Sequence, residues 1–95
     1  GLVAIISRMQ NLQTLDIGWN RVDQEVARVL VSHQRLLTEL YMDNTTKNPL
    51  VILSIVKGLH NLQYVSASTM RCNIEFNQTQ KHLFVSYQRC VLDVS

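Results

Sequence analysis

The chain has 95 residues, of which 46% are hydrophobic and 17% are charged, so it can form one small domain with a core and is too apolar to be disordered. Nine Lys and Arg against seven Asp and Glu give a formal net charge of +2 without any basic run, which argues against nucleic-acid binding. No apolar run approaches the roughly eighteen residues that cross a bilayer, and the start has neither a basic segment nor a cleavage site, so we expect neither membrane insertion nor secretion.

The first part of the chain alternates between predicted helix and predicted strand. The segment from Leu2 to Ile6 is apolar at helical spacing and predicts a helix. The segment from Leu12 to Ile17 ends in alternating apolar and polar residues, which predicts a short strand. Asp23 then offers an N-cap for a second helix that runs to about Ser32.

The same order of elements recurs in the middle of the chain. The segment from Leu37 to Met42 predicts the second strand. Asn48 and Pro49 offer an N-cap followed by a proline at the first helical position, so a helix is predicted from Leu50 to Gly58. The glycine suits the end of that helix, and the segment from Leu62 to Ala67 predicts the third strand.

The last part of the chain is less regular. The segment from Met70 to Gln80 is polar and predicts an irregular loop, followed by a brief helix around residues 81–86. The segment from Leu92 to Ser95 repeats the pattern of the first strand, with Arg89 in the position that Leu12 holds there. We therefore expect a fourth, degenerate parallel strand at this end.

A repeat of 25 residues underlies this alternation. Leu15, Leu40 and Val65 hold equal positions in the first three predicted strands, and the apolar positions upstream recur at the same step with the spacing of one helical face. Each unit is therefore predicted to be a strand, a turn and an amphipathic helix whose apolar stripe faces the strand. The fourth copy follows after 27 residues, from Val65 to Leu92.

The pattern Leu12-x-x-Leu15-x-Ile17-x-x-Asn20 resembles the leucine-rich-repeat family, in its ribonuclease-inhibitor-like and cysteine-containing subclasses. The resemblance implies an α/β fold: a right-handed solenoid of about 3.5 repeats over residues 1–95, with parallel strands on the concave face and helices on the convex face. In that family the asparagine bonds the backbone of the turn. Thr45 and Met70 stand in its column here, and Asn44, one position early, is the expected substitute in the second turn.

Isolated repeats of this kind do not fold, because each apolar face needs a neighbouring unit to cover it. We therefore expect the chain to be a segment of a longer solenoid whose open ends are covered by further repeats or other chains. Function is expected on the concave face, where strand residues alternate with the core columns. Twelve such positions hold four acidic and no basic residues, against about two charges expected at average composition. A basic protein or peptide is thus the favoured partner.

Large amphipathic residues often anchor interfaces, and Tyr41 and Tyr64 lie near the centre of this surface. Trp19 stands at the exit of the first strand, where it either joins the interface or packs over its own turn. The predicted partner-binding residues are Asp16, Trp19, Glu39, Tyr41, Asp43, Tyr64, Ser66 and Asp93.

We expect no enzyme, cofactor or metal site. His33, His60 and His82 fall at helix ends or in a helical column rather than at a shared site, and no glycine-rich motif or nucleophile elbow is present. Cys72 and Cys90 are eighteen positions apart and fit free thiols in a reducing compartment, which favours the cytoplasm. The sequons at Asn44 and Asn77 leave an extracellular location open.

The leading hypothesis is a protein-interaction module, and the resemblance implies roles such as the substrate-recognition part of a ubiquitin ligase or the repeat domain of an intracellular receptor or sensor. One alternative is a structural subunit that docks inside a larger assembly. Another is a small α/β enzyme in which the repeat is accidental. The order of the strands separates these, because doubly wound α/β folds reorder their strands whereas a solenoid stacks them sequentially.

Overall fold

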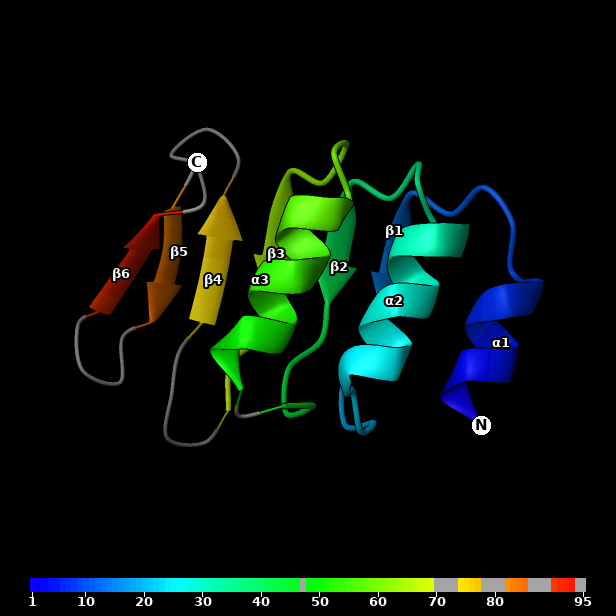
Figure 1. Ribbon diagram of the computed structural model, residues 1–95, viewed down its shortest axis with the longest axis horizontal. Helices are drawn as coiled ribbons and strands as arrows, with labels where there is room; N and C mark the ends of the chain where they lie inside the picture. The colour runs from blue at the N-terminus through cyan, green and yellow to red at the C-terminus, as the bar shows by residue number, and fades with distance from the viewer. Residues whose placement is uncertain (47, 70–73, 78–81, 86–89, 94–95) are drawn as a thin grey trace.

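The computed structural model describes residues 1–46, 48–69, 74–77, 82–85 and 90–93, the last three ranges as backbone strands. The described elements, in chain order, are α1 (Leu2–Arg8), β1 (Thr14–Asp16), α2 (Gln24–His33), β2 (Glu39–Tyr41), α3 (Pro49–Gly58), β3 (Tyr64–Ser66), β4 (Ile74–Asn77), β5 (His82–Val85) and β6 (Cys90–Asp93). In Figure 1 the helices lie side by side along one face of the sheet. The chain is thus an α/β domain.

The strands β1, β2 and β3 are parallel and in the predicted register. Leu15 pairs with Leu40, and Leu40 pairs with Val65, so the three residues lie one above another on adjacent strands. Backbone hydrogen bonds extend this register beyond the strands. The N–H of Ile17 donates to the carbonyl oxygen of Tyr41 at 2.8 Å, and the N–H of Met42 donates to the carbonyl oxygen of Ser66 at the same distance. The 25-residue step of the sequence is therefore the spacing of successive strands.

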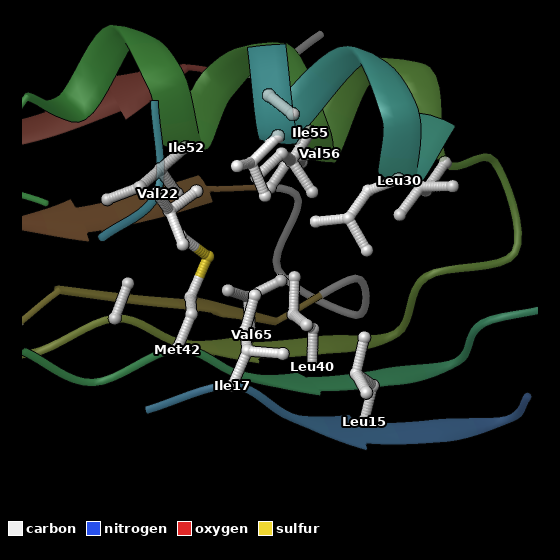
Figure 2. Close-up of a cluster of buried hydrophobic side chains, with 14 of the residues drawn as sticks. Leu15, Ile17, Val22, Leu30, Leu40, Met42, Ile52, Ile55, Val56 and Val65 are labelled. Atoms are coloured by element: carbon white, nitrogen blue, oxygen red, sulfur yellow. The ribbon is translucent and has the colours of Figure 1, made fainter. Parts of the chain in front are cut away.

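The core lies between this parallel sheet and the helices. Leu40 and Val65 are fully buried, and Leu15 retains only 7% exposure. In Figure 2 their side chains point from the strands toward Leu30 of α2 and Ile55 of α3. Burial of a large aliphatic side chain stabilises a fold by roughly 1.5–3 kcal/mol, so this column is a main source of stability.

The predicted helix starts are confirmed. The Asp23 carboxylate accepts a hydrogen bond from the N–H of Val26 at 3.1 Å, which caps α2. The Asn48 side chain accepts from the N–H of Leu50 at 3.0 Å, and Pro49 is the first residue of α3. Side-chain capping satisfies N–H groups that the first turn of a helix leaves unpaired.

The turns after β1 and β2 are held by different residues in the same position. The Asn20 amide donates to the carbonyl oxygens of Ile17 and Gly18, both at 3.1 Å. Twenty-five residues later, the Thr45 hydroxyl donates to the carbonyl of Met42 at 2.7 Å, which matches the bond from Asn20 to Ile17. The prediction that Asn44 substitutes for the asparagine is therefore wrong, because Thr45 itself reaches the turn carbonyl. Met70 lies outside the described residues.

The sheet continues beyond β3 with antiparallel strands, in the order β1-β2-β3-β4-β5-β6. The prediction of an irregular loop over 70–80 is wrong at β4, and the predicted helix around 81–86, with His82 in a helical column, is wrong at β5. The sequences Ile74–Asn77 and His82–Val85 are rich in β-branched and aromatic residues, which favour strands, but polar neighbours hide the signal.

The fourth predicted strand exists in part as β6, but its direction and place differ from the prediction. It pairs antiparallel with β5 and is separated from β3 by two strands, so it is not a fourth parallel repeat. Val94 and Ser95 lie outside the described residues. Parallel repetition therefore covers three units rather than 3.5, because β4 takes the edge of β3 that a fourth parallel strand would need.

Gln34 is the one buried polar residue of the described core, at 1% exposure. Its amide nitrogen donates to the carbonyl oxygens of Ile6 at 3.0 Å and Met9 at 2.9 Å, and thus ties the end of α2 to the end of α1. The amide oxygen has no hydrogen-bond partner. Met9 and Leu59 occupy the same column in the neighbouring units, so the polar side chain replaces an apolar contact at this one place.

We predict that Gln34→Met lowers the free energy of unfolding by about 1–2 kcal/mol. Methionine keeps the shape of the side chain but removes the donor of one buried and one partly buried hydrogen bond, and loss of the unpartnered amide oxygen offsets part of that cost. Urea unfolding followed by circular dichroism measures the change. The exposed Gln10→Met is the matched control, and equal stability of both variants would contradict a stabilising role for the amide.

The prediction that a helix ends at Gly58 is confirmed, since α3 spans Pro49–Gly58, but the glycine serves this end in an unexpected way. Its φ is negative, so it does not provide a left-handed helix end. A Cβ at this position would lie 2.6 Å and 2.7 Å from the two methyl groups of Val31, so glycine lets α3 approach α2 closely. Valine is stiff at χ1 and cannot readily turn aside.

Gly58→Ala is therefore expected to destabilise the fold, although alanine favours helices over glycine by up to about 1 kcal/mol. Overpacking of a close contact typically costs about 1–3 kcal/mol, which outweighs that gain. In a Val31→Ala background the same change should cost less, because only the Cβ of residue 31, at 3.2 Å, remains close. Thermal unfolding of the four proteins in this double-mutant cycle measures the coupling, and additive effects would show that the helices are not limited by this contact.

Candidate functional site

The face of the parallel sheet opposite the helices carries polar and aromatic side chains. Strand residues alternate between the two faces, so the neighbours of the buried column point away from the core. The register aligns them in two rows across the strands. We call this surface the open face; its residues are Thr14, Glu39 and Tyr64 in one row, and Asp16, Tyr41 and Ser66 in the other.

Glu39, Tyr41 and Tyr64 form a connected group at the centre of the open face. The Tyr41 hydroxyl donates a hydrogen bond to the Glu39 carboxylate at 2.9 Å. The rings of Tyr41 and Tyr64 are 5.8 Å apart between centroids and inclined at 53°, within the range of favourable aromatic pairs. All three side chains are half-buried. They therefore present a partly fixed surface of two rings and one carboxylate.

The hydrogen bond to Glu39 raises the pKa of the Tyr41 phenol, because ionisation would remove the shared proton and place two negative charges together. Partial burial and the negative charges of Glu39 and Asp16 act in the same direction. Tyr41 therefore stays a neutral donor at physiological pH. The Glu39–Tyr41 pair was not predicted, although a spacing of two residues on a strand places both side chains on one face.

Asp43 and Ser66, both predicted to bind a partner, are bonded to each other. One Asp43 carboxylate oxygen accepts from the Ser66 hydroxyl at 2.8 Å and from the N–H of Ser68 at 2.8 Å. The carboxylate thus ties the turn after β2 to the end of β3. Asp16 differs, since it is exposed and its carboxylate accepts only the N–H of Gly18, at 2.9 Å in its own turn.

Trp19 projects from the turn after β1. It is 78% exposed, so the alternative that it packs over its own turn is wrong. Its backbone N–H donates to the carbonyl of Asp43 at 3.0 Å, which continues the ladder between the first two units. The structure does not bring Asp93 to this surface, because β6 is separated from β3 by β4 and β5. The position of the Asp93 side chain lies outside the described residues.

The strands of the described parallel units carry acidic but no basic residues. The strands β1, β2 and β3 contain Asp16 and Glu39 and no basic residue. The basic residues in the described units lie in helices or in loops: Arg8, Arg21, Arg28, Arg35 and Lys57. The other basic residues, Lys47, Arg71, Lys81 and Arg89, lie outside the described residues. The open face is thus locally acidic in a chain of net charge +2.

Across the described ranges, no three His, Cys, Asp or Glu residues are grouped so that they could hold a metal ion. His33 ends α2 and His60 follows α3, both exposed, and His82 belongs to β5. No helix in the described part of the chain is long and apolar enough to span a bilayer. The open face and Trp19 therefore remain the candidate site.

The hydrogen bonds predict unequal roles for the two aspartates. Asp43→Ala should lower the free energy of unfolding by about 1–3 kcal/mol, because it removes the acceptor of two hydrogen bonds between units, one from a backbone N–H. Asp16→Ala should cost less than about 1 kcal/mol, since it removes one exposed bond within a turn. Urea unfolding of both variants tests the order, and a larger loss for Asp16→Ala would refute the structural role of Asp43.

Comparison of the chain with protein-family models, curated proteins and solved structures found no match. No relative therefore assigns a role to the open face or to Trp19. The arrangement, charge and exposure of these side chains are the basis for the function proposed below.

Proposed function

We propose that the chain is a segment of a right-handed solenoid of the leucine-rich-repeat type, and that its open face binds a protein or peptide ligand. Support for the repeat comes from the register of Leu15, Leu40 and Val65 and from the sequential order of the strands, which differs from the reordered sheets of doubly wound folds. In this proposal the open face is the concave surface. The resemblance favours adaptor roles, such as substrate recognition in a ubiquitin ligase or ligand sensing.

The observation that carries the binding role is the composition of the uncovered rows. An interface core is typically rich in tyrosine and tryptophan, and such residues often dominate binding energy. Here Tyr41 and Tyr64 contact each other at the centre, on the face that no described helix covers. Their hydroxyl groups and the neighbouring carboxylates supply polar partners around the rings. Two aromatic rings in contact on an uncovered face are more typical of a binding surface than of a sheet with a structural role alone.

The charge of the open face favours a basic ligand. Asp16 and Glu39 lie on adjacent strands, and no basic side chain of β1–β3 neutralises them. Since the whole chain has a net charge of +2, overall attraction would not draw a cationic peptide to it. A cationic ligand would have to be held by the local field of the open face.

A second candidate is a structural subunit that docks through one end. Within the described residues, β1 pairs only with β2, so its other edge is unpaired. Ile5 belongs to α1, the helix that precedes β1 in the chain, and is 50% exposed. An unpaired edge is a template for another strand. Sedimentation of the purified chain separates the candidates, because a free binding module stays monomeric whereas a docking subunit associates through this edge.

Binding of a fluorescein-labelled nona-lysine peptide, measured by anisotropy at low ionic strength, tests the proposed face. Glu39→Gln should weaken binding by roughly twofold to fivefold, the effect of one exposed ion pair. Simultaneous Tyr41→Ala and Tyr64→Ala should weaken it further, provided that thermal unfolding shows the variant to be folded.

Glu25→Gln is the matched control, because it removes the same charge from the first turn of α2 rather than from a strand. It should leave binding nearly unchanged. Equal losses for Glu25→Gln and Glu39→Gln would mean that the peptide senses only total charge, and the open face would then have no binding role.

A further inference from the structure

Trp19 combines two features that the fold itself does not need. The side chain is 78% exposed, although it is the largest apolar side chain and the only tryptophan of the protein. Its φ of 64° lies in the left-handed region, which bulky residues rarely adopt. Strain of this kind persists where the surrounding structure enforces it and is found preferentially at functional sites.

The next unit shows what this turn requires. Asn44 lies 25 residues later in the same position, with a φ of 59°, and asparagine tolerates this conformation far better than tryptophan. Both residues donate their backbone N–H to the following unit, Trp19 to Asp43 at 3.0 Å and Asn44 to Ser68 at 2.7 Å. Any residue can make that bond. The turn therefore explains the backbone at position 19 but not the indole.

Trp19 stands in the turn that follows β1, and the Asp16 carboxylate of the open face is bonded to this turn. Gly18 directly precedes Trp19, and the Gly18 N–H donates to the Asp16 carboxylate at 2.9 Å. A Cβ built on Gly18 would be 3.2 Å from that carboxylate and 3.3 Å from the carbonyl oxygen of Asp43, so the backbone here is flanked by two acceptors. An exposed ring on a turn whose backbone is bonded to a carboxylate suits a ligand that is both flat and positively charged.

We infer that Trp19 anchors an arginine side chain of a basic peptide that lies along the open face; this inference rests on the function proposed above. The guanidinium group is planar, stacks on indole rings and pairs with carboxylates through two parallel hydrogen bonds. A lysine ammonium has the same charge but neither the plane nor the paired donors. Trp19 thereby distinguishes arginine from lysine, whereas Asp16 and Glu39 attract either.

The test compares nona-arginine with nona-lysine on the parent protein and on Trp19→Asn, which copies the turn of Asn44. The parent should bind nona-arginine roughly twofold to fivefold more tightly, the range of an exposed cation–π contact. Trp19→Asn should lose most of this preference, although the carboxylates keep a smaller one, and it should melt at the same temperature as the parent or higher. Because Trp19 is the only tryptophan, its fluorescence should respond to nona-arginine more than to nona-lysine.

Leu50→Asn is the control, since Leu50 is 62% exposed at the start of α3 and lies outside the open face. It should keep the preference for arginine. If Trp19→Asn retains the preference, or if Leu50→Asn loses it equally, Trp19 is not an arginine anchor. If Glu39→Gln still weakens nona-lysine in those cases, the proposed function stands and only this inference fails.

Discussion

The stacking of Leu15, Leu40 and Val65 is the constraint on which the rest of the molecule depends. Each residue is the middle position of a three-residue strand, and its burial under the helices decides which side of the strand faces outward. A slip of one residue would turn the tyrosines and carboxylates into the core and expose the leucines. The apolar column therefore fixes the open face as firmly as it fixes the core, although no residue of that face contributes to it.

Equivalent turns in the first two units are held by different side chains. Asn20 and Thr45 both donate to a carbonyl three residues earlier, so an amide and a hydroxyl do the same work. Gln34 takes a position that is apolar in the neighbouring units and uses it to join two helix ends. Hydrogen bonds and burial therefore recur at a step of 25 residues. The side chain at a given position can differ between units if it makes the same hydrogen bond or fills the same volume.

The sequence predicts the three units and their register because the apolar residues recur at a fixed step. It does not predict β4 or β5, whose short apolar runs stand among polar residues and have no copy elsewhere in the chain. Alignment of Leu92 with Val65 gives a fourth strand but neither its direction nor its neighbour, because register between distant strands depends on which edges are free. Likewise, the bond from Asp43 to Ser66 joins residues 23 apart and leaves no local pattern.

One side of the parallel sheet forms the core, and the other is the face for which we propose a binding role. Beyond β3 the antiparallel β4 occupies the sheet edge, while at β1 the turn carries an exposed indole on a left-handed backbone. The fold tolerates that strain because Leu15 and Ile17, on either side of Asp16, are buried and hold β1 from beneath. A residue whose backbone conformation is unfavourable can persist in a turn only if contacts of the neighbouring residues fix that conformation. The buried residues of β1 meet that condition, so the surface above them can carry residues that do not contribute to packing.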